Sequence, residues 1–119
     1  MISGDHLYVN DTMNFRVQVF DLSGNFIRMF GVHGDSPGYI NRPKGLAVNS
    51  QGHIFIAEAV ANRIQIFNLD GKYLLDFGFS GKQQAAFRMP TGIAIANDKI
   101  YVADSGNQRI QVFEYLEEK

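Results

Sequence analysis

One stretch of fifteen residues is written three times in this chain of 119 residues. The copies read YVNDTMNFRVQVFDL at 8–22, FIAEAVANRIQIFNL at 55–69 and YVADSGNQRIQVFEY at 101–115. When they are aligned on Arg16, Arg63 and Arg109, the period is 47 and then 46 residues, in the range of solenoids, propellers and arrays. Because one such unit cannot bury its hydrophobic side chains alone, the chain is predicted to stack like units against each other.

The alignment extends beyond the three copies. Further matches are Gly24 with Gly71, Pro43 with Pro90, Gly45 with Gly92, and Phe30-Gly31 with Phe77-Gly78. Within one period, short segments rich in Ile, Val, Phe and Tyr are separated by Gly, Asn and Asp, and none has helical periodicity. In the middle copy these segments are 45–48, 53–59, 63–69 and 73–78. They predict a four-stranded antiparallel meander with tight turns.

The third strand of the middle copy predicts how the meanders pack. Ile64 and Ile66 point to one face, while Gln65 and Phe67 point to the other, because side chains alternate along a strand. Both faces therefore carry apolar groups, which are buried only when the sheet lies between two like sheets. Four-stranded sheets stacked radially form a β-propeller, so the predicted fold class is all-β.

These motifs resemble the NHL repeat. The pieces that carry the resemblance are Pro43–Val48, Pro90–Ile95, Ile100–Asp104 and Asn107–Phe113, and together with their copies they cover nearly the whole chain. The second copy departs from the pattern, since Ala61 stands at the asparagine position and Glu58 replaces aspartate. NHL propellers are typically six-bladed, so the resemblance implies a ring of six blades, of which this chain supplies two to three.

The strands of a blade are called a to d in chain order. The predicted division of the single partial propeller, 1–119, is an incomplete b-c-d blade at 1–31, a full blade at 45–78 and an incomplete a-b-c blade at 92–115. Of the first strand a, only Ile2 is predicted to remain. Six blades need on the order of 280 residues, so two explanations stay open. The chain is the C-terminal part of a longer propeller, or two copies build one ring by two-fold symmetry.

Composition excludes several kinds of function. The net charge is −1 and no basic block occurs, which makes nucleic acid an unlikely partner. There is no cysteine, so disulfides, thiolate zinc sites and cysteine nucleophiles are excluded. No apolar run approaches the ~20 residues of a membrane helix, and no signal peptide is visible after Met1. Since no nucleophile or phosphate-loop motif occurs either, no catalytic residue and no cofactor are predicted.

An acid precedes each repeated arginine by five residues, at Asp11, Glu58 and Asp104. The acid ends strand b and the arginine opens strand c, so the two can pair across the hairpin. We interpret the pairs as scaffold, with ligand binding at one end of the ring as the alternative. Asparagines near the same turn are interpreted as turn residues, because Asn tolerates a left-handed backbone and caps turns. They are Asn14, Asn62 and Asn107.

The three histidines do not form a metal set in the sequence. His6 and His53 align just before strand b, where Lys99 takes the third place, so this position is interpreted as facing solvent. His33 lies in a d-to-a loop, and Ser80 stands at the equivalent site. Because metal sites need three or four converging ligands, no metal site is predicted and His33 is interpreted as a surface residue.

The two d-to-a loops, 31–43 and 78–90, are the most individual segments, and loops on a rigid scaffold commonly carry binding. In propellers they share one face with the b-to-c turns. Tyr39 and Phe87 are interpreted as plugs between blades, and Met13 also lies on this face. The candidate residues for binding a ligand or partner are Asp11, His33, Asp35, Arg42, Glu58, Lys82, Arg88 and Asp104.

Three functions are compatible with these residues. Mixed charge on the loop face favours a non-catalytic interaction scaffold that binds a protein or peptide. Resemblance to NHL-like lyases and lactonases offers a metal-dependent enzyme completed by other blades or a second chain. RNA binding, known for some NHL propellers, is disfavoured by the charge. The predicted partners are other propeller blades, from a longer parent chain or a second copy, without membrane insertion. Similar bacterial proteins are often exported, so an extracytoplasmic location is an expectation from resemblance.

Overall fold

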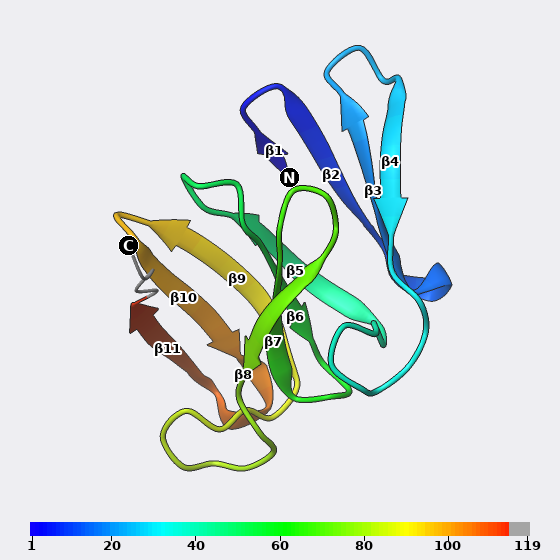
Figure 1. The fold of residues 1–119 in the computed structure, drawn as a ribbon. Helices are drawn as coiled ribbons and strands as arrows, with labels where there is room; N and C mark the ends of the chain where they lie inside the picture. The colour runs from blue at the N-terminus through cyan, green and yellow to red at the C-terminus, as the bar shows by residue number, and fades with distance from the viewer. Residues whose placement is uncertain (115–119) are drawn as a thin grey trace.

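The computed structural model describes residues 1–114 as three antiparallel β-sheets with two short 3-10 turns. Figure 1 shows the sheets side by side as a fan, with the first in blue, the second in green and the third in orange. The predicted all-β propeller fold is confirmed. None of the helical segments in residues 1–114 is long and hydrophobic enough to cross a bilayer.

Each sheet is a meander of neighbouring strands. The first blade contains β1 (Ile2–Ser3), β2 (His6–Asp11), β3 (Arg16–Asp21) and β4 (Phe26–Phe30). The second contains β5 (Pro43–Val48), β6 (Ile54–Glu58), β7 (Arg63–Phe67) and β8 (Tyr73–Phe77). The third contains β9 (Pro90–Ala96), β10 (Lys99–Asp104) and β11 (Arg109–Glu114). The 3-10 turns η1 (Thr12–Asn14) and η2 (Ser105–Asn107) join strands b and c.

The first and third blades differ from the second in their outermost strands. Ile2 and Ser3 pair with Leu7 and His6, so strand a of the first blade is a two-residue strand. The third sheet has three strands within residues 1–114. Tyr115, where strand c was predicted to end, lies outside the described residues.

The turns between strands c and d follow directly from their sequence. Asp21 is the last residue of β3, and Asn68 directly follows β7. Asp21 Oδ1 accepts the backbone N–H of Asn25 at 2.8 Å, and Asn68 Oδ1 accepts that of Lys72 at 3.0 Å. Such Asx turns leave a position with positive φ, which glycine adopts at no steric cost. Gly24 and Gly71 stand there with φ of +88° and +83°.

The core lies in two seams between the blades. Tyr8, Val17 and Val19 of the first blade pack against Ile54, Ile56 and Phe67 of the second. Ile64, Ile66 and Phe55 on the opposite face of the second blade pack against Ile100 and Val102 of the third. The alternation along strand c therefore sends Ile64 and Ile66 to one neighbour and Phe67 to the other, as the sequence predicted.

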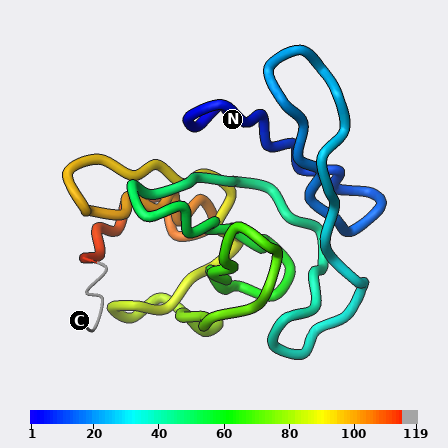
Figure 2. The backbone as a smooth tube through the Cα atoms, turned by 45° about the horizontal axis from the view of Figure 1, so that its top comes forward, coloured from blue at the N-terminus to red at the C-terminus, as the bar shows by residue number. Residues whose placement is uncertain are grey.

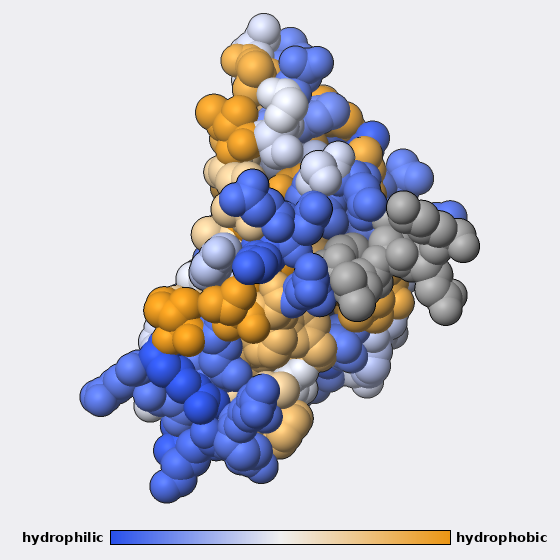
Figure 3. All heavy atoms as spheres, turned by 90° about the vertical axis from the view of Figure 1, so that its left-hand side faces the viewer, coloured by the Kyte–Doolittle hydropathy of each residue, from blue (hydrophilic) through white to orange (hydrophobic). Residues whose placement is uncertain are grey.

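Both flanks of the fan expose apolar side chains. On the first blade Val9 is 37% exposed, and on the third blade Ile110 and Val112 are 62% and 53% exposed. Figure 3 views the molecule from the side of the third blade and shows hydrophobic surface there, in orange, between hydrophilic residues. These flanks correspond to the faces that the second blade buries in its two seams, so within residues 1–114 the fan is open at both ends.

The b-to-c turns and the d-to-a loops lie at one end of the fan, and Figure 2 shows the two loops on the same side of the tube. We call them loop 31–42, between β4 and β5, and loop 78–89, between β8 and β9. Each is closed by a parallel bridge, between His33 and Ile40 in the first and between Ser80 and Phe87 in the second.

The residue that plugs each seam was predicted correctly in one loop and wrongly in the other. Phe87 is fully buried, with its ring 5.8 Å from that of Phe113. Tyr39, by contrast, is 45% exposed, and Ile40 is the fully buried residue of its loop. The bridge partners explain the difference, because Ile40 and Phe87 occupy the same place in their loops and Tyr39 stands one residue earlier.

Candidate functional site

A buried polar cluster lies where the second blade meets loop 31–42. Glu58 ends β6 and pairs in register with Arg63 at the start of β7. The Glu58 Oε1 atom is 2.7 Å from Arg63 Nε and 2.6 Å from Gln65 Nε2. All three residues are buried. Gln65 lies on the same face of β7 as Arg63, two residues later, so the three side chains form one unit, which we call a socket.

Loop 31–42 fills this socket with backbone atoms. The N–H of Asn41 donates to Glu58 Oε2 at 2.7 Å, and the N–H of Gly38 donates to Gln65 Oε1 at 2.8 Å. The carbonyl of Tyr39 accepts from Arg63 Nη2 at 3.2 Å and from Gln65 Nε2 at 2.6 Å. The socket therefore fixes the path of the loop and leaves its side chains free to point elsewhere.

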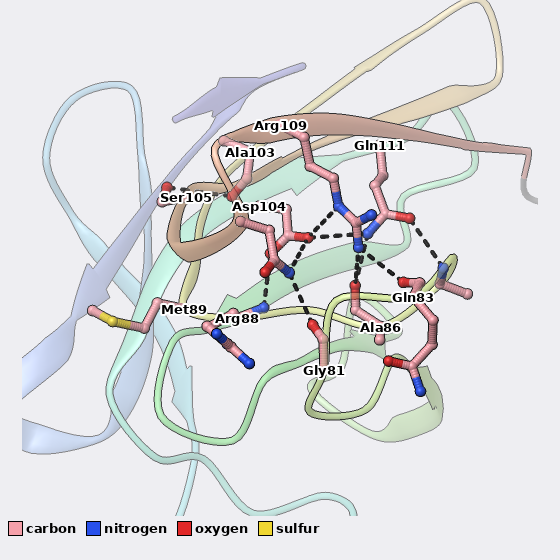
Figure 4. A network of polar contacts seen from close by, with 12 residues as sticks. Gly81, Gln83, Ala86, Arg88, Met89, Ala103, Asp104, Ser105, Arg109 and Gln111 are labelled. Carbon is pink, nitrogen blue, oxygen red and sulfur yellow. Dashed lines mark hydrogen bonds and ion pairs between the residues drawn. The ribbon is translucent and has the colours of Figure 1, made fainter.

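The third blade repeats the same bonds with a different loop, as Figure 4 shows for Asp104, Arg109 and Gln111. The N–H of Arg88 donates to Asp104 Oδ1 at 2.7 Å. The carbonyl of Ala86 accepts from Arg109 Nη2 at 3.0 Å and from Gln111 Nε2 at 2.7 Å. Loop 78–89 is thus bound through its backbone in the second socket.

Electrostatics favour the charged form of Asp104. Burial acts to raise the pKa of this carboxyl, but the hydrogen bonds from the Arg88 backbone N–H and from Asn107, Arg109 and Gln111 outweigh burial and leave the pKa below its usual value. The side chain is therefore an anion at neutral pH, held beneath the loop rather than offered to solvent.

The first blade carries the same three residue types, and no loop of residues 1–114 lies over them. Arg16 Nε lies 2.8 Å from Asp11 Oδ2, and Gln18 Nε2 lies 3.2 Å from the same oxygen. The side chains of Arg16 and Asp11 are 33% and 24% exposed, whereas those of Arg63 and Glu58 are 10% and 0% exposed. Hydrogen bonds from Arg16 and then Asn14 hold the pKa of Asp11 below its usual value.

The three asparagines serve the turn in two ways. Asn14 and Asn107 lie in η1 and η2 and donate from Nδ2 to Asp11 Oδ1 at 3.0 Å and to Asp104 Oδ2 at 2.9 Å. Asn62 has φ of +55°, the left-handed conformation expected of asparagine. In the other two turns the residue directly before the arginine has this conformation as well. These residues are Phe15 and Gln108, with φ of +57° and +54°.

The remaining candidate residues divide by exposure. Glu58 and Asp104 are fully buried beneath the loops. His33, Asp35, Arg42, Lys82 and Arg88 are exposed on the loop face. Within residues 1–114, the side chains of Arg42, Lys82 and Arg88 make no ion pair. Asp35 accepts from Asn41 Nδ2 at 2.8 Å, and the His33 ring stacks on Phe15 at 3.9 Å.

Arg42 and Arg88 do not occupy equivalent places. Arg42 directly precedes Pro43 and has φ of +52°, a conformation that Met89 adopts before Pro90. Arg88 stands one residue earlier and matches Asn41, whose backbone N–H makes the same bond to the socket acid. Both arginine side chains nevertheless reach solvent on the loop face.

The histidines are dispersed over the molecule. His6 pairs in register with Asp21, at the end of the blade away from the loops. His53 stands just before β6, and its backbone N–H donates to Asn49 Oδ1 at 2.8 Å. Both are half-buried, not solvent-facing as predicted from the sequence. Among the described residues, no group of three or more His, Asp or Glu is placed to hold a metal ion.

Two families match the sequence. The family described as 6-bladed beta-propeller matches residues 1–83, and the NHL repeat matches residues 87–113. Together the two matches reach from the first blade to the third. No curated protein matches the sequence of this chain.

Solved propeller structures share the fold at low sequence identity. A catalytically inactive virginiamycin B lyase from Staphylococcus aureus, with quinupristin, has a TM-score of 0.67 at 17% identity over 97% of this chain and 40% of that one. An auxiliary nutrient binding protein from Bacteroides thetaiotaomicron has a TM-score of 0.70 at 15% identity, over 91% of this chain and 34% of that one. BamB from Moraxella catarrhalis has a TM-score of 0.62 at 18% identity, over 93% of this chain and 29% of that one. The chain thus spans 29–40% of the length of these structures.

Proposed function

The chain belongs to the 6-bladed beta-propeller family, and on this basis we propose that it is a non-catalytic interaction scaffold. It binds a protein or peptide through the loop face, which we define as the exposed side chains of loops 31–42 and 78–89 and of turns η1 and η2. Three blades leave a six-bladed ring open, so other blades complete it.

The observation that carries this proposal is the way in which the sockets hold the loops. Each loop is bound through backbone N–H and carbonyl groups, from Gly38 to Asn41 in one and from Ala85 to Arg88 in the other. Side chains that make no structural bond can then face a partner without cost to the fold. Binding sites are commonly built in this way, from variable loops on a rigid scaffold.

The exposed groups suit a polypeptide partner. Arg42, Lys82 and Arg88 are cations without an ion-pair partner within residues 1–114, and Tyr39, at 45% exposure, adds an aromatic ring. Arginine and tyrosine are enriched in protein interfaces. The net charge of −1 gives no support to RNA as the partner. A metal-dependent lyase would need ligands from beyond the described residues.

The test uses charge reversal on the loop face. Peptides selected from a random display library against the full chain are measured by fluorescence anisotropy with three variants, R42E, R88E and K72E. We expect R42E or R88E to weaken binding about tenfold or more, as the loss of a charge-assisted contact predicts. Lys72 lies exposed in the c-to-d turn at the opposite end, so K72E is the matched control.

The proposal fails if the selected peptides bind R42E and R88E as tightly as the unchanged chain. It also fails if K72E weakens binding as much as the two loop variants, because the effect is then one of total charge and not of the loop face.

A further inference from the structure

The outer face of the first blade carries a third socket, formed by Asp11, Arg16 and Gln18, that no loop of residues 1–114 covers. We propose that this open socket is a docking site for the backbone of a d-to-a loop from a propeller blade outside this chain. The inference rests on the proposed completion of the ring by other blades. It does not depend on partner binding at the loop face, because the socket lies on the flank of the fan, although Asn14 of turn η1 touches both.

The two filled sockets define what the occupant must present. In each, one loop N–H reaches the acid, at 2.7 Å from Glu58 and from Asp104. A second N–H reaches the glutamine oxygen, at 2.8 Å from Gln65 and 3.0 Å from Gln111. One carbonyl accepts from both the arginine and the glutamine. The ligand is therefore a turn of polypeptide backbone with two donors and one shared acceptor.

The open socket is already arranged for these bonds. Arg16 Nε and Gln18 Nε2 hold the Asp11 carboxylate as their counterparts hold Glu58. Where a loop N–H reaches Asp104 Oδ1, the side chain of Asn14 reaches Asp11 Oδ1 at 3.0 Å. Arg16 Nη1 rests 3.3 Å from the Met29 sulfur, which is a weak acceptor. Asn14 thus occupies a contact that a loop N–H would make. Met29 stands where Asp76 meets Arg63 Nη1 in the second blade, so Arg16 Nη2 is the group that corresponds to the donor for the loop carbonyl.

Apolar side chains surround the open socket, as they do the filled ones. By the repeat, Leu7, Val9 and Phe20 match Ile54, Ile56 and Phe67, which are 0%, 0% and 2% exposed in the first seam. Val9 is 37% exposed, and the neighbouring Ile2, Phe26 and Met29 are 63%, 55% and 55% exposed. Such a patch marks an interface. The occupant buries this patch together with a large apolar side chain equivalent to Ile40 or Phe87.

The occupant is a blade other than the three described. Both d-to-a loops within residues 1–114 are already bound, one in each filled socket. Residues 1–114 of a second copy could fill the open socket with a d-to-a loop only by withdrawing that loop from its own socket. The socket forms its hydrogen bonds to the loop with backbone N–H and carbonyl groups. Any blade with a loop of this shape can therefore make the same polar contacts. This assigns a polypeptide loop and not a small molecule to the site.

The test adds a free peptide to the isotope-labelled full chain. The peptide carries the sequence of residues 73–90, which forms strand d and the loop that fills the second socket. Nuclear magnetic resonance titration follows the side-chain amide of Gln18 and the Nε–H of Arg16. We expect saturable shifts at both groups, while the amides of Gln65 and Gln111 stay unchanged because their sockets are occupied. A peptide of scrambled order is the control for composition.

Variants separate the socket from the apolar patch. Q18L removes the donor and the acceptor that the loop would use from a half-buried side chain. We expect it to weaken binding of the peptide about tenfold. Q51L makes the same change at an exposed turn away from the site and should bind as the unchanged chain does.

Three results overturn the proposal. The first is no shift at Gln18 at millimolar peptide, or equal shifts with the scrambled sequence. The second is undiminished binding to Q18L, which would reduce the site to a nonspecific apolar patch. The third is a shift at Gln18 on raising the protein concentration alone, which would make a second copy the occupant.

Discussion

The charge of Glu58 is the most sensitive point in the socket of the second blade. Its Oε1 accepts from Arg63 and Gln65, and its Oε2 accepts the N–H of Asn41. In the variant E58Q the side chain keeps its size but has one acceptor oxygen and one NH₂ group. At least one of the three donors then faces another donor, inside a site that is fully buried.

The expected cost of E58Q is about 3 kcal/mol of unfolding free energy. The better amide orientation turns the NH₂ group toward Asn41 and loses one charge-assisted bond, which costs about 1.5–3 kcal/mol. Arg63 also loses its buried counterion, and breaking a buried pair costs about 3–5 kcal/mol in total. Asp76 lies 3.6 Å from Arg63 Nη1 and partly compensates the charge, which places the cost at the lower end.

Urea denaturation of the full chain measures this cost, and D11N provides the matched control. The same chemical change is made there in the open socket, where Asp11 and Arg16 are 24% and 33% exposed and water replaces the lost contacts. We expect D11N to shift the midpoint clearly less than E58Q, because exposed ion pairs contribute little. Equal losses in the two variants would refute the argument that the loop, rather than the pair itself, makes the socket important.

Three further changes test other parts of the structure. G45A places a methyl group 2.7 Å from the carbonyl oxygen of Thr91 in the neighbouring blade, and we expect it to cost about 1–3 kcal/mol in urea denaturation. G92A, whose nearest neighbour lies at 3.3 Å, should cost less, and the reverse order would contradict the seam geometry. Because Asp104 has a folded pKa below its ordinary 3.8, its stabilisation is complete above that value and is lost as pH falls through the folded pKa. The unfolding free energy of the unchanged chain should therefore drop in acid, and the drop should be smaller in D104N. If D104N loses as much stability in acid as the unchanged chain, this role of Asp104 is wrong. F87A empties a fully buried site and should cost about 3–5 kcal/mol in the same assay, unless the seam collapses around it.

The repeat was sufficient to predict the fold, because each strand shows its period and each turn shows its residues. Ile64 and Ile66 face one neighbour and Phe67 the other, as alternation requires. The acid and arginine of each copy flank one hairpin at fixed spacing, so their approach could also be predicted. These features depend on the geometry of single strands and hairpins, which residues close together in the sequence determine.

The features that depend on the loops are harder to predict. Alternation places Gln65 on the correct face but assigns it no role, although its position two residues after Arg63 is an available signal. Tyr39 is predicted as the plug in place of Ile40, because the register of an irregular loop follows no period. The left-handed positions of Phe15 and Gln108 are imposed by the turn, since neither residue type favours that conformation.

Backbone recognition in the sockets has a consequence for how blades choose their neighbours. The polar contacts of the two filled sockets are the same, although one loop reads GVHGDSPGYINR and the other GFSGKQQAAFRM. Polar contacts of this kind cannot distinguish one loop from another. Discrimination must then come from the apolar plug, which is Ile40 in the first seam and Phe87 in the second, beside Phe77 and Phe113. The socket therefore requires only the backbone shape of the loop in a neighbouring blade. The volume of one apolar side chain in the seam then determines which blade fits.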